Sequence, residues 1–501
     1  MVKFFTFPDK LSNYFSKSIN QIFFSNLILF FISIIFLLNI NNGHDWGGDF
    51  SMYIMHALNI AEGKPYAETG YIYNTEVVYG PPSYPPIFPL ILSPFVSIWG
   101  LNLKVLKFPV VFCFILFLFY INNSLLPRKE ISPGLKTFFI LALGFFPYFF
   151  QLSESILSDL PFLLFCFLAL NLIDYQINEL IKTKINFGIS LLSGFLIYLS
   201  FGTRTIGLVL IPVAILYSFL KKKTIDKGIL ISISTAIILT FLQNYLLNQP
   251  GGYLDYIPKT FTGIFTTLIN SIIYYFSLFF GIFSTKNFII SSVFFVLIFE
   301  TLILGFIQNI KRGLSSFDVF FVIYLCVLLI WPSYQGYRFL VPVLPLYFLY
   351  IFVGFDFVME KINNPKIKTI FILLFIGFFC INYYQAYVHI FPHPISALEE
   401  PETQEIFRQV KFKTNDEDII LFFKPRVLAL FTGRKSLAMK LPDPEGDALK
   451  KMKKFGVDYV ILNKNHLIEY QPELKNYIFS NPTHFFLIFE NSKFNFYKVL
   501  Y

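Results

Sequence analysis

Residues 23–53 read FFSNLILFFISIIFLLNINNGHDWGGDFSMY: an apolar run from Phe23 to Ile40, followed at once by a polar segment with two aspartates. Apolar runs of about 18 residues are long enough to cross a hydrocarbon core of roughly 30 Å. Comparable runs recur at 105–121, 229–247, 288–307 and 367–381. The chain is 55% hydrophobic and only 14% charged, whereas soluble domains average roughly 25% charged residues. We therefore predict an all-α polytopic membrane protein.

Basic residues between the apolar runs predict the orientation of the chain, because cytoplasmic loops are enriched in Lys and Arg. Lys3, Lys10 and Lys17 place the N-terminus in the cytoplasm. The other turns expected inside are Arg128 to Lys136, Lys182 to Lys184, Lys221 to Lys223, Lys311-Arg312 and Lys361 to Lys368; those expected outside are 41–104, Gln151–Asp159, Gly202–Thr205, Asn248–Thr260 and Ser333–Arg338. This alternation predicts about eleven spans and an external C-terminus.

The alternation requires two choices about apolar segments. Pro85–Gly100 is apolar but rich in proline, and a span there would move Arg128 outside. We expect it to lie along the outer membrane surface. Only one of the runs 261–283 and 287–307 fits between the loops on either side, and we expect 287–307 to span. The first run would then be an interfacial or re-entrant helix.

The chain changes character near residue 390, where we place the boundary between a membrane domain (1–390) and an external domain (391–501). Short strand-like runs alternate there with helical stretches, which predicts a small α/β domain. Expected helices are Thr403–Lys413 and Asp447–Phe455, and expected strands are Asp418–Phe423, Asp458–Leu462, Phe485–Glu490 and Phe494–Leu500. This domain is nearly neutral, so the net charge of +9 belongs to the membrane loops and indicates no nucleic-acid partner.

Three aspartates are candidate site residues because acidic groups held against a membrane are costly unless they serve an ion, a proton or a substrate. Asp45 and Asp49 lie in the first loop, and Asp159 opens an apolar helix. The alternative is that they cap helices, since Asp is a favoured N-cap residue. Asp45 and Asp49 also form a weak metal-ligand pair. We predict no metal cluster, name no cofactor, and leave a divalent cation open.

Two arginines stand near the same expected face of the membrane. Arg204 lies between two apolar runs, and Arg338 follows Tyr337. Each could extend to lipid headgroups on its own. Together with the aspartates, they would suit the phosphate of an anionic lipid, because a guanidinium binds phosphate through two hydrogen bonds.

These motifs resemble the GT-C membrane glycosyltransferases that use polyprenyl-phosphate sugars, which include protein O-mannosyltransferases and lipid A aminoarabinose transferases. The resemblance rests on Asp49 after the first span, Tyr84-Pro85-Pro86 leading to Trp99-Gly100, Asp159, the surroundings of Arg204, and the stretch from Tyr337-Arg338 to Pro345. It implies Asp49 as catalytic base and Asp159 as second acid, with Tyr84 near the lipid phosphate and Tyr337 in substrate binding. Family members usually carry Asp-Glu where this chain has Asp49-Phe50, so Asp45 stays a rival.

The resemblance implies an enzyme that moves a hexose or pentose from a polyprenyl-phosphate donor to a glycan, lipid or protein acceptor outside the plasma membrane. A lipid-sugar flippase or other transporter is the main alternative. Transporters commonly carry repeated halves with broken helices near the midplane, whereas here the polar residues gather on one side and the first loop is asymmetric. A non-catalytic assembly partner is a third possibility, and it would tolerate loss of Asp49 and Asp159.

Overall fold

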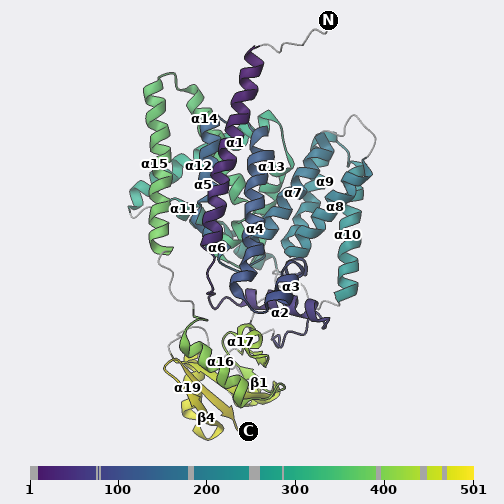
Figure 1. Ribbon diagram of the computed structural model, residues 1–501, viewed down its shortest axis with the longest axis vertical. Helices are drawn as coiled ribbons and strands as arrows, with labels where there is room; N and C mark the ends of the chain where they lie inside the picture. Colours follow the sequence, from purple (N-terminus) through teal and green to yellow (C-terminus); the bar gives the residue numbers. More distant parts are fainter. Residues whose placement is uncertain are drawn as a thin grey trace.

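The computed structural model describes residues 9–74, 77, 81–178, 186–247, 260–284, 287–390, 397–439, 448–464 and 471–501. A bundle of long helices occupies most of the molecule, and a small sheet lies at one end of it (Figure 1). The start of α1 lies at the opposite end of the bundle. The turn at Lys182–Lys184, most of the loop Asn248–Thr260 and the expected domain boundary after residue 390 lie outside the described residues.

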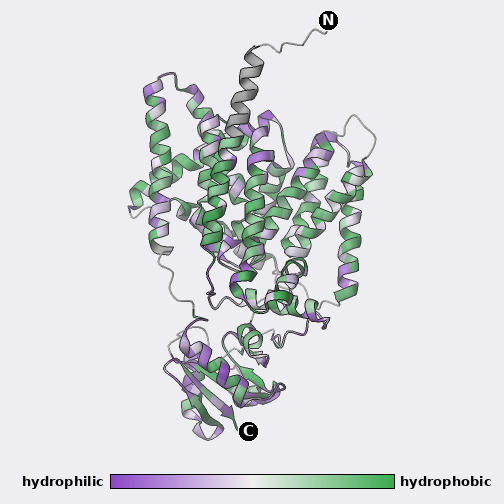
Figure 2. Cartoon of the chain, in the orientation of Figure 1, coloured by the Kyte–Doolittle hydropathy of each residue, from purple (hydrophilic) through white to green (hydrophobic). Residues whose placement is uncertain are grey.

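The bundle is formed by helices from along the first 390 residues. They are α1 (Asp9–Leu38), α4 (Leu103–Tyr120), α5 (Pro133–Gly144), α6 (Pro147–Ser153), α7 (Asp159–Asn178), α8 (Phe187–Thr203), α9 (Leu210–Lys222), α10 (Lys227–Leu247), α11 (Phe261–Ile282), α12 (Phe288–Arg312), α13 (Ser316–Ile330), α14 (Leu344–Lys361) and α15 (Pro365–Ile390). Hydrophobic residues run along them, with hydrophilic residues at their ends (Figure 2). This distribution is that of a multi-pass membrane protein.

Seven helical segments of the described chain are long and apolar enough to cross a membrane, or eight if the bent pair α5 and α6 forms one span. Shorter apolar helices, including Phe187–Thr203 and Ser316–Ile330, lie beside them, so the predicted count of about eleven depends on these shorter helices. Both α11 and α12 qualify by length and composition. The choice between them, and the side that faces the cytoplasm, stay predictions.

Close helix contacts in the bundle depend on small residues. A Cβ atom on Gly305 of α12 would lie 1.8 Å from the carbonyl oxygen of Tyr350 in α14, and one on Gly354 would lie 1.9 Å from that of Thr301. No side chain fits there. Small residues let helix backbones approach closely where lipid supplies no hydrophobic drive between helices. This crossing fixes α14, most of whose side chains are buried, at the centre of the bundle.

Two short helices lie between the bundle and the C-terminal sheet: α2 (Gly48–Glu62) and α3 (Ile87–Trp99) (Figure 1). They pack on each other, with Tyr53 of α2 edge-on to Phe88 of α3 at 4.9 Å between ring centroids. The proline-rich segment expected on the membrane surface therefore forms α3, a 13-residue helix beside the ends of the long helices. Together α2 and α3 form a platform under the bundle.

The C-terminal part contains a five-stranded sheet of order β2-β1-β3-β5-β4. Its strands are β1 (Ile419–Leu421), β2 (Lys435–Leu437), β3 (Val457–Asn463), β4 (Phe485–Glu490) and β5 (Phe494–Val499); its helices are α16 (Pro401–Lys413), α17 (Pro425–Thr432), α18 (Ala448–Lys454) and α19 (Gln471–Ser480). The four predicted strands are present, and the α/β class is confirmed. Three-residue β2 was missed because so short an edge strand has no readable alternation.

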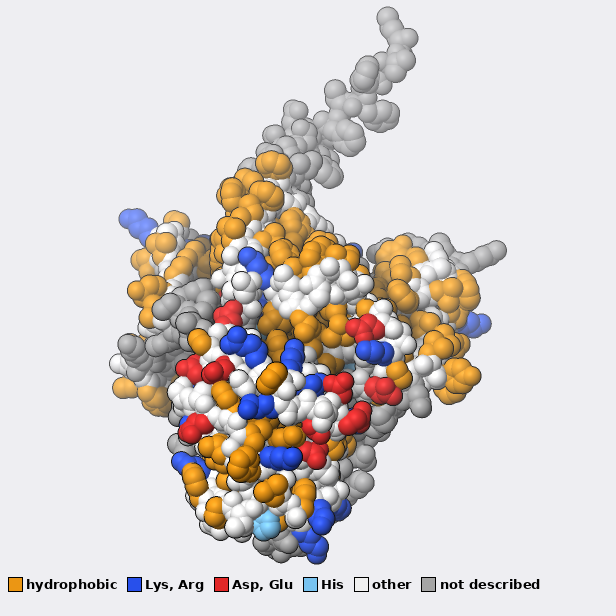
Figure 3. Space-filling model, turned by 60° about the horizontal axis from the view of Figure 1, so that its bottom comes forward, with side chains coloured by type: hydrophobic (Ala, Val, Ile, Leu, Met, Phe, Trp, Pro, Cys, Tyr) orange, Lys and Arg blue, Asp and Glu red, His pale blue; other side chains and the backbone are white. Residues whose placement is uncertain are grey.

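The first loop docks onto this sheet through its backbone. Ile72 donates to the carbonyl oxygen of Ser436 in β2, and Ser436 donates to that of Gly70, each at 2.9 Å. Trp46 inserts among Phe407, Phe422 and Phe423, with ring centroids 5.3–6.2 Å away. Acidic and basic side chains are interspersed on this end of the molecule, whereas hydrophobic side chains dominate the bundle (Figure 3). The sheet is thus tied to the loop that carries the candidate aspartates.

Candidate active site

Five charged side chains from five segments meet where the bundle faces the C-terminal sheet. We name Asp49, Asp159, Arg204, Arg338 and Arg426 the carboxylate–arginine cluster. Asp49 lies in the first turn of α2, and Asp159 is the first residue of α7. Arg204 follows α8, Arg338 lies in a short 3-10 helix (Gly336–Leu340), and Arg426 lies in the first turn of α17. Four of these charges stand at or next to a helix end, and Arg338 lies in the middle of its short 3-10 helix.

Asp49 is the most accessible member of the cluster, with 24% of its side chain exposed. One carboxylate oxygen accepts a hydrogen bond from the Tyr84 hydroxyl at 2.7 Å and lies 3.5 Å from Arg426. The other pairs with Arg338. Burial alone would raise the pKa of Asp49, but Arg338 and Arg426 outweigh it and lower the pKa to about 2. Asp49 is therefore a carboxylate at every physiological pH.

Asp159 is almost completely buried, at 1% exposure, and binds two arginines. One oxygen pairs with Arg204, and the other accepts from Nε of Arg338 at 2.9 Å. Arg338 therefore bridges Asp159 and Asp49. Both arginines are only about 15% exposed. They are held by carboxylates and do not extend singly to headgroups.

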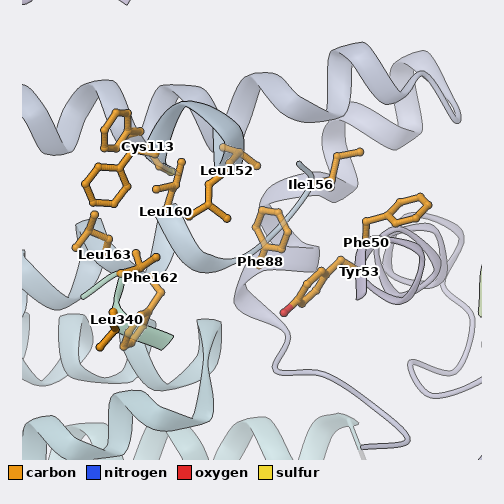
Figure 4. Close-up of a cluster of buried hydrophobic side chains, with 14 of the residues drawn as sticks. Phe50, Tyr53, Phe88, Cys113, Leu152, Ile156, Leu160, Phe162, Leu163 and Leu340 are labelled. Atoms are coloured by element: carbon orange, nitrogen blue, oxygen red, sulfur yellow. The ribbon is translucent and has the colours of Figure 1, made fainter. Parts of the chain in front are cut away.

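Tyr84 and its neighbours form a neutral support behind Asp49. The ring of Tyr53 stacks on Tyr84 at 4.9 Å, and its hydroxyl is 2.8 Å from that of Ser158. His56, fully buried, lies 2.8 Å from the Tyr66 carbonyl oxygen through Nδ1 and accepts from the Tyr84 amide through Nε2. Burial lowers the pKa of His56 to about 4, which keeps the ring neutral. Figure 4 shows Phe50 and Tyr53 of α2 beside Phe88 and Ile156 in the apolar packing under this support.

Asp45 and Tyr337 lie outside the cluster. The carboxylate of Asp45 is 80% exposed and accepts from the Gly47 amide at 2.9 Å, with His44 beside it. The hydroxyl of Tyr337 donates to the Leu278 carbonyl oxygen at 3.2 Å, and its ring packs against Tyr148. The structure thus brings together Asp49, Asp159, Arg204, Arg338 and Tyr84 of the predicted set. Gly47, not Asp49, occupies the N-cap of α2.

Sequence reasoning missed Arg426. It is 2% exposed, and its NH1 donates to the Tyr84 hydroxyl at 2.8 Å. Its sequence context, Pro425-Arg426-Val427 in an amphipathic helix of the C-terminal domain, carries no sign of a site. Only docking of that domain onto the first loop brings it to Asp49.

The cluster has three guanidinium groups against two carboxylates, so it holds one excess positive charge. Such a site attracts a singly charged anion. Among the described residues, no group of three His, Cys, Asp or Glu side chains is placed to hold a metal. Asp49 and Asp159 are the two acids of the cluster, and Arg338 bridges them. The described residues therefore do not fit a metal site with three protein ligands.

Comparison with known proteins gives a likeness in structure and none in sequence. No protein-family model matches the chain, and no curated sequence matches it. ArnT from Cupriavidus metallidurans bound to undecaprenyl phosphate matches with a TM-score of 0.57 and 13% identity, over 94% of this chain and 97% of that one. The archaeal oligosaccharyltransferase AglB from Archaeoglobus fulgidus, in complex with an inhibitory peptide and a dolichol-phosphate, matches with a TM-score of 0.55 and 12% identity, over 88% and 69%.

Both matches extend over the helices of the bundle and into the C-terminal part, since they cover most of this chain. At this identity they establish the architecture. The chain therefore shares the fold of ArnT and AglB, which is the GT-C fold that its motifs implied.

Proposed function

We propose that this protein is a membrane glycosyltransferase that moves a sugar from a polyprenyl-phosphate donor to an acceptor hydroxyl on the outer face of the plasma membrane. The observation that carries the proposal is the carboxylate–arginine cluster, with one partly exposed carboxylate and one excess positive charge. The GT-C fold supports it, because ArnT and AglB with the same fold bind undecaprenyl phosphate and dolichol-phosphate. The acceptor is a glycan, lipid or protein.

The donor phosphate fits the charge of the cluster. A sugar linked to a lipid through one phosphate is a phosphodiester with a single negative charge, which neutralises the excess guanidinium charge. Arg204 and Arg338 present their donors from the bundle side, and guanidinium groups bind phosphate bidentately. In transfer, the acceptor oxygen bonds to the anomeric carbon while the bond from that carbon to the phosphate oxygen breaks. The arginines stabilise the charge left on the departing lipid phosphate.

Asp49 takes the proton of the acceptor hydroxyl. A carboxylate held at a pKa of about 2 is a weak base. Proton transfer is most efficient when the pKa of the catalytic group lies near the working pH, so the pKa of Asp49 must rise for efficient transfer. A donor phosphate that draws Arg338 toward itself weakens the pairing with Asp49 and raises the basicity of this carboxylate. Donor binding thus prepares the base, and Asp159 keeps both Arg204 and the shifted Arg338 paired at the site.

The direct test uses purified protein in liposomes with radiolabelled polyprenyl-phosphate sugars and candidate acceptors. Transfer of label to an acceptor supports the proposal. Movement of the labelled lipid between leaflets without transfer would identify a flippase instead. Absence of both, together with no binding of polyprenyl phosphate, would indicate an assembly partner.

The proposed topology places the membrane domain (1–390) with a cytoplasmic N-terminus and the domain 391–501 outside. Single cysteines at Lys222 and Glu62, in a background with the four native cysteines replaced by serine, test it. Glu62→Cys should react with an impermeant thiol reagent in intact cells, and Lys222→Cys only after permeabilisation. The reverse pattern would put the cluster on the cytoplasmic side and end the outer-face proposal.

A further inference from the structure

Arg426 is the only member of the carboxylate–arginine cluster that belongs to the C-terminal domain. Its guanidinium contacts three groups of the first loop: the Tyr84 hydroxyl at 2.8 Å, the Pro81 carbonyl oxygen at 3.3 Å and the Asp49 carboxylate at 3.5 Å. Its positive centre also lies over the rings of Tyr71 and Tyr84, 4.9 and 5.3 Å from their centroids. Cation–π contacts of this kind are strong when the cation is desolvated. Arg426 therefore orders the residues that present Asp49.

The contacts form a relay. Arg426 donates to the Tyr84 hydroxyl oxygen, and the Tyr84 hydroxyl donates its own hydrogen to Asp49. His56 holds the Tyr84 amide from the other side. Because a hydroxyl that accepts a hydrogen bond becomes a better donor in a chain of such bonds, Arg426 tightens the bond from Tyr84 to Asp49.

A purely structural role as an anchor for the domain explains Arg426 less well. The domain is already attached through the backbone bonds between Gly70, Ile72 and Ser436 and through Trp46. Placing a charge in a buried site is costly unless it is fully paired. Yet Nε of Arg426 is buried and has no partner among the described residues. Buried polar groups that are left incompletely satisfied occur at catalytic sites.

We propose that Arg426 is a positioning residue for the transfer reaction, and that through it the C-terminal domain is part of the active site. It holds Tyr84 and Asp49 together at 2.7 Å. Loss of Arg426 also removes a charge that lowers the pKa of Asp49, so a fall in kcat would report lost positioning and not lost basicity. This inference rests on the proposed function. It assigns the domain a role in the chemical step, in addition to any part it takes in acceptor recognition.

The test compares Arg426→Gln and Arg426→Lys in the full-length protein. Gln removes the charge, and Lys keeps it but loses the fork that reaches Tyr84 and Pro81 together. We expect kcat to fall about 10- to 100-fold in Arg426→Gln, with donor KM changed less than threefold, and Arg426→Lys to recover part of the loss; this range corresponds to one charge-assisted hydrogen bond. Arg434→Gln is the matched control, since Arg434 is also mostly buried and its guanidinium, among the described residues, binds Thr414, Asp416 and Lys411 of its own domain.

A readout without turnover separates this inference from the proposed function. Hydrogen–deuterium exchange of α2 and of residues 81–86 should rise in Arg426→Gln and stay at the wild-type level in Arg434→Gln. In a double-mutant cycle, Tyr84→Phe should add little to the loss caused by Arg426→Gln, because both act on Asp49 through one relay. If the wild-type protein transferred no sugar but exchange of α2 still rose in Arg426→Gln, the proposed function would be wrong, and the structural coupling of Arg426 to α2 would stand. If Arg426→Gln had the same kcat and the same hydrogen exchange as the wild type, the inference would be wrong and the proposed function would stand.

Discussion

Two buried polar clusters lie at opposite ends of α7. The carboxylate–arginine cluster begins at Asp159. About 22 Å away along the helix, from a rise of 1.5 Å per residue, Asp174 accepts from Tyr217 at 2.7 Å and from the Ser316 amide at 3.0 Å. Next to it, Asp318 accepts from Asn309, Tyr350 and Ser315 at 2.6–2.8 Å, and its capping box closes the start of α13. We name this second group the Asp318 cluster.

The two clusters satisfy their carboxylates differently. The hydrogen bonds to Asp318, which is 1% exposed, come from neutral donors of the bundle, and the nearby Lys129 binds Asn309 of this cluster at 2.8 Å. The other end uses arginines from three segments, one of them in another domain, and leaves Asp49 partly exposed. Hydrogen bonds from neutral donors that join neighbouring helices stabilise a fold. Charges assembled from distant segments with an open edge are arranged for a charged ligand. We therefore expect changes in the Asp318 cluster to affect stability and changes in the carboxylate–arginine cluster to affect activity.

The largest effect is expected at Asp49. Asn retains its size but cannot take a proton, so Asp49→Asn should lower kcat about 10²- to 10⁴-fold, the usual worth of a positioned general base. Donor binding and membrane insertion should persist. Asp45→Asn is the control and should keep full activity, because Asp45 is exposed outside the cluster. Loss in Asp45→Asn with activity in Asp49→Asn would move the base four residues upstream.

Because His56 is buried in its neutral form, the stability of the protein should fall at acidic pH. The pKa of His56 falls from 6.5 to about 4 on folding, so the unfolded chain binds the extra proton between these values. Stability is complete above pH 6.5 and is lost as the pH falls toward 4, by about 3 kcal/mol in total. Thermal unfolding between pH 7.5 and 4.5 measures the slope, and His56→Gln should flatten it. An unchanged slope in that variant would remove His56 from the pH dependence.

The arginines of the bundle should differ from each other. Arg338 binds both Asp49 and Asp159, whereas Arg204 pairs with one carboxylate of the cluster, Asp159, and lies over the ring of Phe339. Arg338→Ala should weaken polyprenyl-phosphate binding by about 1.5–3 kcal/mol, and Arg204→Ala by the lower part of that range. Titration of protein in detergent with the lipid phosphate gives the affinities. Equal affinity in wild type and both variants would show that the two arginines serve only the internal carboxylates.

The smallest effect on function is expected in the Asp318 cluster. Tyr350→Phe removes one hydroxyl donor from Asp318 and should cost about 1–2 kcal/mol of unfolding free energy. The kcat of the folded variant should equal that of wild type. Thermal denaturation and turnover measured on the same preparation check both. A large fall in kcat with normal stability would erase the distinction between the two clusters.

Several features could be predicted from sequence because they depend on composition along a continuous stretch. Apolar runs predicted the helices, whereas the orientation across the membrane that the basic turns indicate stays a prediction. Strand runs such as Phe485–Glu490 were found because their alternation is local. Asp49, Asp159, Arg204, Arg338 and Tyr84 were chosen from charge placement and motif resemblance, and the structure brings these five together.

The sequence by itself determined the membrane class, the helical bundle and the α/β tail, since hydrophobic length and periodicity are local properties of the chain. Tertiary structure alone decided that Arg338 bridges two aspartates 110 residues apart in the chain, that Asp45 and Tyr337 stay outside, and that Arg426 enters the cluster. The physical reason is that a buried ion pair depends on distance and desolvation between segments far apart in the sequence. Neither the distance nor the desolvation can be read from the residues that neighbour each charged residue in the sequence.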